Sequence, residues 1–160
     1  MAMAGTAWEA AATVVDPELQ VVTIADLGIL RDVRAEGGHV TVTITPTYSG
    51  CPAMDAIRDD VLTALAAAGH RDAQVVTVLD PPWSTDDITD AGRAKLAAAG
   101  VAPPAPVSVD GGPVPLRLSV ACPRCGSGDT EQISRFGSTA CKALWRCRAC
   151  AEPFDHLKSL

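Results

Sequence analysis

The sequence predicts two folded parts, a small mixed α/β domain followed by a zinc ribbon. Strand-like alternation of apolar residues surrounds a Gly-Gly pair, helix-like spacing flanks it, and two C-x-x-C pairs stand near the end of the chain. Composition indicates an α/β domain over residues 1–100, a linker over 101–115 and a ribbon over 116–160. The linker is assigned because five of its fifteen residues are proline and two are glycine.

Composition limits both the core and the kind of partner. The 160 residues are 48% apolar but only 4% aromatic, so we expect an aliphatic core. The net charge of −6 is uneven, because residues 1–100 hold fourteen acids and six bases whereas 101–160 hold five acids and seven bases. An acidic body argues against a nucleic-acid partner, since affinity for phosphates comes from clustered Lys and Arg.

The chain shows no targeting or membrane segment. Its first residues lack a basic region followed by an apolar one, and no apolar run has the length of a membrane span. Six cysteines without a secretion signal favour metal or redox chemistry over disulfides. We therefore expect a cytoplasmic protein without a membrane partner.

Periodicity assigns the elements of the α/β domain. A helix is predicted over 6–15 with Thr6 as its N-cap, and alternating runs on both sides of Gly37-Gly38 predict a β-hairpin. Spacings of three and four predict a helix over 52–68. The apolar run over 75–79 predicts a strand buried on both faces, and Ser84 is expected to cap a helix that continues to residue 99.

Four cysteines have the spacing of a four-thiolate metal site. Cys122 and Cys125 are separated by twenty-one residues from Cys147 and Cys150. A ribbon of this size has too little core to fold alone, so metal binding is expected to supply folding free energy. One structural zinc ion per chain is the preferred cofactor because closed four-sulfur sites are usually structural. Rubredoxin-type iron uses the same ligands and is the alternative.

The positive excess of the ribbon has a simple interpretation. Zinc bound to four thiolates carries a charge of about −2. Arg124, Lys142, Arg146 and Arg148 are expected to offset that charge.

Cys51 is the one cysteine of the first domain. It is expected at the N-cap of the helix that begins at Pro52, where the helix dipole would lower the pKa of its thiol and raise its reactivity. The alternative is a small buried apolar residue. Asp26, which precedes Leu27-Gly28, is a candidate turn carboxylate in support of the Cys51 loop.

Cys141 is the sixth thiol, six residues before Cys147. Two interpretations are open. It is either an ordinary packed residue or a second reactive thiol close to the metal. In the second case it could hold a labile cluster together with Cys51.

Several motifs together carry a resemblance to a known family. The first domain resembles the metal–sulfur cluster assembly domain of SufT-like proteins in Asp16-Pro17-Glu18, Asp26-Leu27-Gly28, Thr47-x-x-x-Cys51-Pro52 and Pro81-Pro82-Trp83. The whole chain is similar to the PaaD family, accessory proteins of the bacterial phenylacetyl-CoA ring 1,2-epoxidase. The more particular matches are Trp83-Ser-Thr-Asp-Asp-Ile, Gly92-Arg93-x-Lys95-Leu96 and the ribbon segment from Phe136 to Leu144.

The resemblance implies an iron–sulfur-assembly-type fold and an accessory role, without catalysis by the chain itself. It implies delivery of an iron–sulfur cluster or iron to the oxygenase or its reductase, with Cys51 as the working thiol on a transient cluster and Thr47 as a supporting hydroxyl. The implied partners are these two components and the iron–sulfur assembly machinery. The chain ends without the further cysteine expected in some relatives, so no role is assigned to such a thiol.

Two other functions remain open at this point. An adaptor that docks the oxygenase components through its acidic face and ribbon would need the ribbon cysteines but not Cys51. An electron-transfer subunit would need a redox-active iron site. A lone thiol such as Cys51 could also share a cluster across a two-fold axis, so a homodimer is compatible with the sequence.

Overall fold

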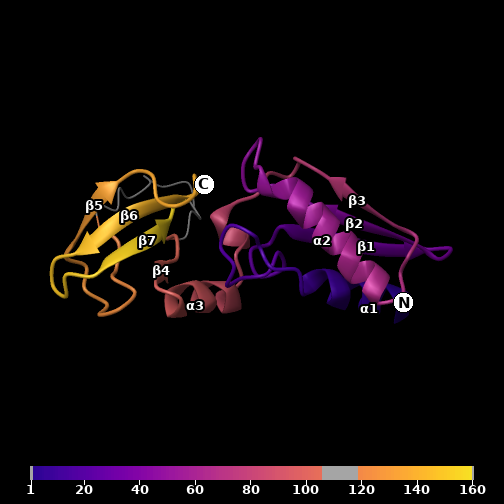
Figure 1. The fold of residues 1–160 in the computed structure, drawn as a ribbon, viewed down its shortest axis with the longest axis horizontal. Helices are drawn as coiled ribbons and strands as arrows, with labels where there is room; N and C mark the ends of the chain where they lie inside the picture. Colours follow the sequence, from indigo (N-terminus) through magenta and orange to yellow (C-terminus); the bar gives the residue numbers. More distant parts are fainter. Residues whose placement is uncertain (1, 106–118, 160) are drawn as a thin grey trace. The chain divides into compact units, whose positions relative to one another are not determined.

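The structure, a computed structural model, describes residues 2–105 and 119–159 (Figure 1). The chain divides into two compact units, Met1–Gly92 and Arg93–Leu160. The predicted linker falls largely outside the described residues, as does the start of the predicted ribbon. The sequence-based boundaries of domain, linker and ribbon therefore stay predictions.

The first unit is a three-stranded sheet packed with two helices. Its elements are α1 (Ala2–Ala12), β1 (Leu30–Glu36), β2 (His39–Ile44), α2 (Ala53–Ala67), β3 (Ala73–Thr77) and the 3-10 turn η1 (Thr85–Asp87). The strand order is β1-β2-β3, with β1 and β2 antiparallel and β2 and β3 parallel (Figure 1). The predicted hairpin and the mixed α+β class are confirmed.

Alternation along β2 builds the core of this unit. Val40, Val42 and Ile44 are fully buried, whereas the threonines between them are partly exposed. Each helix supplies one apolar stripe at helical spacing. The buried stripes are Ala7 and Ala11 on α1 and Ile57, Val61 and Leu65 on α2.

Two predictions about these elements differ from the structure, namely the N-cap of the first helix and the burial of the last strand. Thr6 lies inside α1 rather than at its N-cap, because its hydroxyl donates hydrogen bonds back to the carbonyls of Ala2 and Met3. The strand predicted to be buried on both faces is the edge strand β3. Val76 and Leu79 in and after it are 39% and 65% exposed.

The helix predicted over 84–99 is two elements. Ser84 does cap η1, with a reciprocal bond to Asp87, but Ile88 is extended and buried, which ends the turn. A helix, α3, then begins after Thr89 and runs over Asp90–Ala98. The Thr89 hydroxyl accepts a hydrogen bond from the N–H of Gly92 in its first turn.

The second unit contains a four-stranded sheet. Its strands are β4 (Val101–Ala102), β5 (Thr130–Ser134), β6 (Lys142–Cys147) and β7 (Pro153–Leu157), in the order β4-β7-β6-β5. The first two residues of the predicted linker thus belong to this sheet, where they pair in parallel with β7. The buried cluster is small and consists of Ala102, Cys122, Ala143, Trp145, Cys147 and Phe154.

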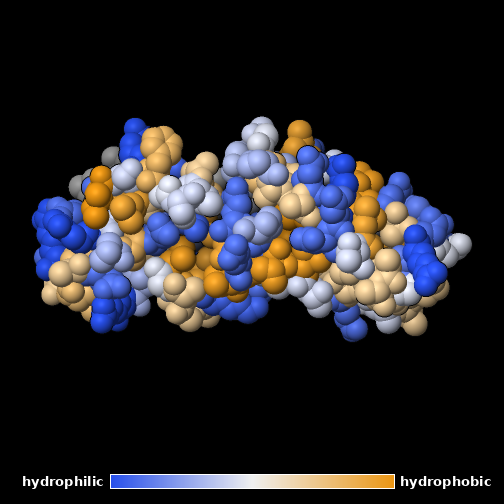
Figure 2. Space-filling view, in the orientation of Figure 1, coloured by the Kyte–Doolittle hydropathy of each residue, from blue (hydrophilic) through white to orange (hydrophobic). Residues whose placement is uncertain are grey.

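Some apolar side chains remain on the surface. Figure 2 shows orange apolar patches interspersed with blue hydrophilic residues on the face that it presents. The most exposed large apolar residues among those described are Phe136 at 72% and Leu79 at 65%. No helix in the described parts of the chain is long and apolar enough to cross a membrane.

Leu27 and Gly28 are clamped by the segment after β3. The indole Nε1 of Trp83, itself buried, donates a 2.7 Å hydrogen bond to the carbonyl of Leu27. Gly28 has a φ of +72°, and a Cβ there would stand 2.5 Å from the carbonyl oxygen of Asp87. Asp87 also pairs with Arg31 at 3.2 Å, which joins this turn to β1. Only glycine satisfies both the conformation and the contact.

We predict that Gly28→Ala destabilises the first unit by about 3 kcal/mol or more, because left-handed strain adds to a steric clash. Gly37→Ala is the matched control, since Gly37 also has a positive φ but open space around it. It should cost about 1 kcal/mol. Urea unfolding followed by circular dichroism measures both. Equal losses in the two variants would contradict the close contact at Gly28.

Candidate functional site

Four cysteine sulfurs converge at one end of the second unit. The Sγ atoms of Cys122, Cys125, Cys147 and Cys150 all lie within 4.8 Å of one another. Two of the separations are 3.8 Å (Cys122 to Cys150) and 3.6 Å (Cys125 to Cys147). A tetrahedron with metal–sulfur bonds of about 2.3 Å has edges of about 3.8 Å, so these thiols fit a closed four-sulfur metal site.

Each C-x-x-C pair is followed by a left-handed residue that turns the chain back. Gly126, with a φ of +75°, donates its N–H to the carbonyl of Cys122 at 2.8 Å. The corresponding position after the second pair is Ala151, with a φ of +64°. The N–H of Cys147 donates a 2.9 Å hydrogen bond to the carbonyl of Glu152 and so closes the turn that contains Ala151. The second turn therefore carries backbone strain that glycine avoids in the first.

The four thiols differ in exposure and acidity. Cys122 and Cys147 are buried, Cys150 is half-buried and Cys125 is exposed. A hydrogen bond from the backbone N–H of Cys150 is the main cause that lowers the pKa of Cys147 to about 7. The Ser127 N–H lowers the pKa of Cys125, but the neighbouring thiols outweigh it and raise that pKa to about 12. Backbone donors thus favour a thiolate at Cys147.

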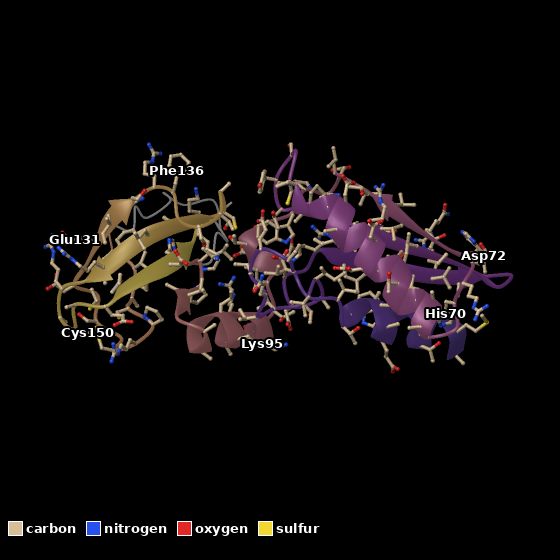
Figure 3. All side chains as sticks on the ribbon, in the orientation of Figure 1. His70, Asp72, Lys95, Glu131, Phe136 and Cys150 are labelled. Carbon is tan, nitrogen blue, oxygen red and sulfur yellow. The ribbon has the colours of Figure 1, made fainter. Side chains whose placement is uncertain are left out.

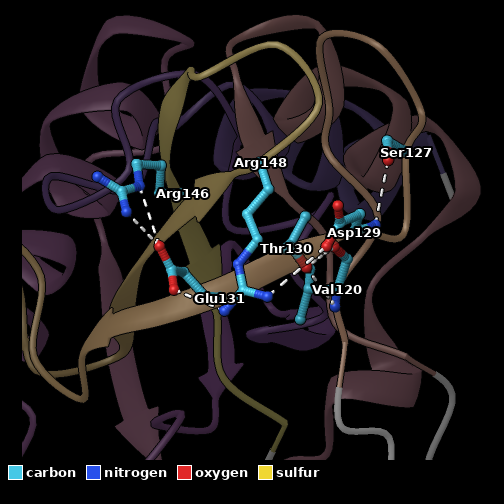
Figure 4. Close-up of polar contacts among 7 residues, drawn as sticks. All are labelled: Val120, Ser127, Asp129, Thr130, Glu131, Arg146 and Arg148. Carbon is cyan, nitrogen blue, oxygen red and sulfur yellow. Dashed lines mark hydrogen bonds and ion pairs between the residues drawn. The ribbon is translucent and has the colours of Figure 1, made fainter.

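Acids neutralise the arginines around this site (Figure 4). The carboxylate of Glu131 accepts hydrogen bonds from both Arg146 and Arg148, and those bonds lower the pKa of Glu131. Arg124 pairs with Glu152 at 2.5 Å, and the pair of Lys142 with Asp155 is 4.0 Å apart. Each of these cations has an acid partner, and the expectation that they offset the charge of a metal–thiolate centre stays a prediction.

Cys51 lies in the loop between β2 and α2. The N-cap of α2 is Pro52, so the predicted N-cap position of Cys51 is off by one residue. The thiol is half-buried, and hydrogen bonds from the Ala53 N–H and with the Thr47 side chain act on it. The structure therefore brings together two of the predicted site residues, Cys51 and Thr47.

The predicted lowering of the Cys51 pKa is wrong. Burial raises the pKa of this thiol, and the carboxylates of Glu18 and Asp16 raise it further, so it is protonated at neutral pH. Both acids belong to the motif Asp16-Pro17-Glu18. Asp16 does hold the turn, accepting from the N–H groups of Glu18 at 2.9 Å and Leu19 at 2.8 Å. The signal that could have placed these acids at the thiol is their presence in one of the motifs shared with the cluster-assembly family.

Asp26 shapes its own turn. Its Oδ2 accepts a 2.9 Å bond from the N–H of Thr23, and the Thr23 hydroxyl accepts from the N–H of Asp26 at 3.1 Å. The carbonyl of Asp26 also accepts from Thr89 at 2.9 Å. The carboxylates whose charge acts on Cys51 are Asp16 and Glu18. A supporting role of Asp26 at the Cys51 loop stays a prediction.

Cys141 is buried at the start of β6, with the Thr139 hydroxyl 3.1 Å from its sulfur. Cys147 stands at the other end of the same strand. Six residues of extended chain separate the two positions by roughly 20 Å. Cys141 is therefore not close to the metal site, which removes that part of the second interpretation. The residue packs in the ribbon.

Comparison with known proteins assigns both units. The family model described as "Iron-sulfur cluster assembly protein" matches residues 6–79, and the "PaaD zinc beta ribbon domain" matches residues 112–158. Fold and site thus define a protein in which an iron–sulfur cluster assembly domain is joined to a zinc ribbon. The chain is 44% identical over 153 residues to a subunit of the "Putative 1,2-phenylacetyl-CoA epoxidase" of Escherichia coli (strain K12), covering 96% of this chain and 91% of the relative. It belongs to the PaaD family.

Other relatives match the first unit alone. The "Fe-S protein maturation auxiliary factor YitW" of Bacillus subtilis (strain 168) is 42% identical over 78 residues, which are 48% of this chain and 76% of that protein. The "Fe-S protein maturation auxiliary factor SufT" of Staphylococcus aureus (strain USA300) is 40% identical over 46% of this chain and 84% of that protein. A crystal structure of a domain of unknown function, DUF59, from Bacillus anthracis has a TM-score of 0.56 and 31% identity, and covers 59% of this chain and 92% of that one.

We predict that single substitutions at the two residues that follow the C-x-x-C pairs have opposite effects on stability. Gly126→Ala should destabilise the metal-loaded second unit by about 1 kcal/mol, and Ala151→Gly should stabilise it by about 0.5–1 kcal/mol, because the left-handed backbone favours glycine. Guanidinium unfolding of both variants at full metal content measures these changes. Effects of the same sign would contradict the strain assigned to Ala151.

Proposed function

We propose that the protein is an accessory factor that matures a 1,2-phenylacetyl-CoA epoxidase by delivering an iron–sulfur cluster or iron to the oxygenase or its reductase component. It does not catalyse the epoxidation itself. Membership of the PaaD family supports the client, and the maturation factors that resemble the first unit support the activity. The observation that carries the proposal is the half-buried thiol of Cys51 with Thr47 and two carboxylates around it.

The chemistry of Cys51 suits temporary rather than permanent binding. Iron–sulfur clusters held permanently in proteins have several protein ligands, commonly four cysteines. One thiol leaves the remaining iron positions for an assembly partner, a second copy of the chain or the acceptor. A cluster bound in this way can be passed on by ligand exchange.

The raised pKa of Cys51 has two consequences for loading. Without cargo the thiol is protonated, and a protonated thiol reacts slowly with oxidants. When iron binds, an Fe–S bond forms and the thiol proton is released, so loading is favoured as the pH rises. The negative charges of Asp16 and Glu18, which oppose the thiolate, attract the incoming cation.

The ribbon is proposed to hold zinc. Its ligands would be Cys122, Cys125, Cys147 and Cys150, whose sulfur separations fit the tetrahedral ion. Bound zinc would supply folding free energy to a sheet with a small buried cluster. Among the described side chains, four sulfurs converge at this point and would occupy all four positions of a tetrahedral ion. No position is then left for a substrate, as is typical of a structural ion.

A second candidate is an adaptor that docks the components of the oxygenase without carrying a cluster. The raised pKa of Cys51 favours this alternative, because a resting thiol is less prepared for metal than a thiolate. The two candidates share the ribbon and differ at Cys51. The adaptor needs no chemistry there.

We predict that anaerobically purified protein contains one zinc per chain together with iron and acid-labile sulfide, and that Cys51→Ala loses the iron and sulfide but keeps the zinc. Cys141→Ser is the matched control, since Cys141 lies about 20 Å from the ribbon metal site along β6. It should retain all three elements. Metal analysis by mass spectrometry and a sulfide assay give the result. Zinc alone in the wild-type protein, even after attempted reconstitution, would favour the adaptor and contradict cluster delivery.

A further inference from the structure

One end of the ribbon presents an aromatic ring that is largely exposed to solvent. The turn between β5 and β6, residues 135–140, is referred to here as the hairpin tip. Phe136 in this tip is 72% exposed, and Ile133 on the preceding strand is 52% exposed. Figure 3 shows the Phe136 label at the edge of the ribbon unit, well separated from that of Cys150. The tip adjoins the end of β6 that is remote from Cys147.

The exposure of the Phe136 ring is built into the backbone. The N–H of Phe136 donates a 3.1 Å bond to the Ser134 hydroxyl, and the N–H of Gly137 donates a 2.8 Å bond to the carbonyl of Lys142. A Cβ on Gly137 would lie 3.0 Å from Oδ1 of Asp155 and 3.0 Å from the Cβ of Lys142, so the tip is tightly seated. A fixed backbone loses little entropy when the tip binds, which favours an interface anchor at this position.

The charges of the ribbon are balanced everywhere except at this tip. Between residues 119 and 159 there are six cations and four acids. Every one of the four acids pairs with a cation, and the pairs are Arg124–Glu152, Arg146–Glu131, Arg148–Asp129 and Lys142–Asp155. Arg135 and Lys158 are left, and within the described residues neither forms an ion pair with an acid.

Lys158 lies over the exposed ring, and Arg135 is the exposed residue that directly precedes Phe136 in the chain. The Nζ of Lys158 lies 5.1 Å from the centroid of the Phe136 ring and donates a 3.2 Å hydrogen bond to the carbonyl of Arg135. The surface therefore combines an apolar ring with the positive charge of Lys158 over it and the exposed cation of Arg135 at the next residue. Its complement is an apolar pocket bordered by carboxylates. Two cations are too few for a nucleic acid, and the chain as a whole carries a charge of −6.

We propose that the hairpin tip docks the protein onto its client, with Phe136 entering an apolar pocket of an acidic surface on the oxygenase or reductase component. The client identity rests on the proposed function above. The tip and Cys51 then perform different tasks, since the tip supplies affinity for the client and Cys51 holds the cargo. Loss of either would abolish maturation, but only loss of the tip would abolish binding.

The test is the affinity of the full-length chain for each purified epoxidase component, measured by calorimetry at low and high salt. Phe136→Ala should weaken binding by about thirtyfold at both salt concentrations, as expected for an aromatic anchor. The double variant Arg135→Glu with Lys158→Glu should weaken it by about tenfold or more at low salt and by much less at high salt, because salt screens exposed charges.

Two control variants match these changes in chemistry but lie in the first unit. Leu79→Ala removes an apolar side chain that is 65% exposed, and Arg71→Glu reverses an exposed charge. Both should bind like the wild type. The zinc content of every variant should equal that of the wild type, and thermal unfolding should change little, since Phe136 and Arg135 are exposed and Lys158 contributes one exposed hydrogen bond.

The outcomes separate this proposal from the proposed function. Wild-type affinity of Phe136→Ala, binding to neither component, or equal losses in the control variants would overturn docking through the tip. Self-association of the chain that Phe136→Ala abolishes would also overturn it, because the occupant would then be a second copy. Iron and sulfide in the client are measured in the same samples. Tip-dependent binding without any transfer of iron would leave docking intact and refute delivery.

Discussion

The second unit depends on the meeting of four cysteine sulfurs at one point. Its buried cluster contains only a few large side chains, chiefly Trp145 and Phe154, and two of the metal-binding cysteines belong to the cluster itself. A core of this size does not offset the conformational entropy of the ordered chain, so the metal is needed to close the two turns. The exposed ring of Phe136 is presented by strands that the metal site anchors at their opposite end.

The thiol of Cys51, in the first unit, lies in a different environment from the ribbon cysteines. That unit has an aliphatic core, and Cys51 is a half-buried thiol in the loop before α2. Burial and two neighbouring carboxylates keep its thiol protonated, whereas a hydrogen bond from the N–H of Cys150 is the main cause that lowers the pKa of Cys147 in the ribbon. The four sulfurs of the ribbon suit a permanently bound ion, whereas the single thiol of Cys51 suits a cargo that is bound and then released. This contrast is the physical basis for assigning structure to the ribbon and cargo to Cys51.

The sequence predicted what short-range patterns determine. Alternation around Gly37-Gly38 located the hairpin, and the C-x-x-C spacing identified the four cysteines whose sulfurs the fold brings together. Contacts between distant segments were out of reach of these patterns. The pKa of Cys51 was predicted in the wrong direction because Asp16 and Glu18 approach it from over thirty residues upstream. The burial of β3 was overestimated, since an apolar run reveals strand character but not whether a neighbour covers its outer edge.

One transfer experiment directly tests whether cargo leaves through Cys51 while the ribbon ion stays. Loaded protein is mixed anaerobically with the cluster-free reductase component, the two are separated, and zinc, iron and sulfide are measured in each. The prediction is that iron and sulfide gained by the reductase equal those lost by the chain, while zinc remains at one per chain. Zinc leaving together with iron, or equal gain by the reductase when Cys51→Ala replaces the wild type, would contradict the central claim.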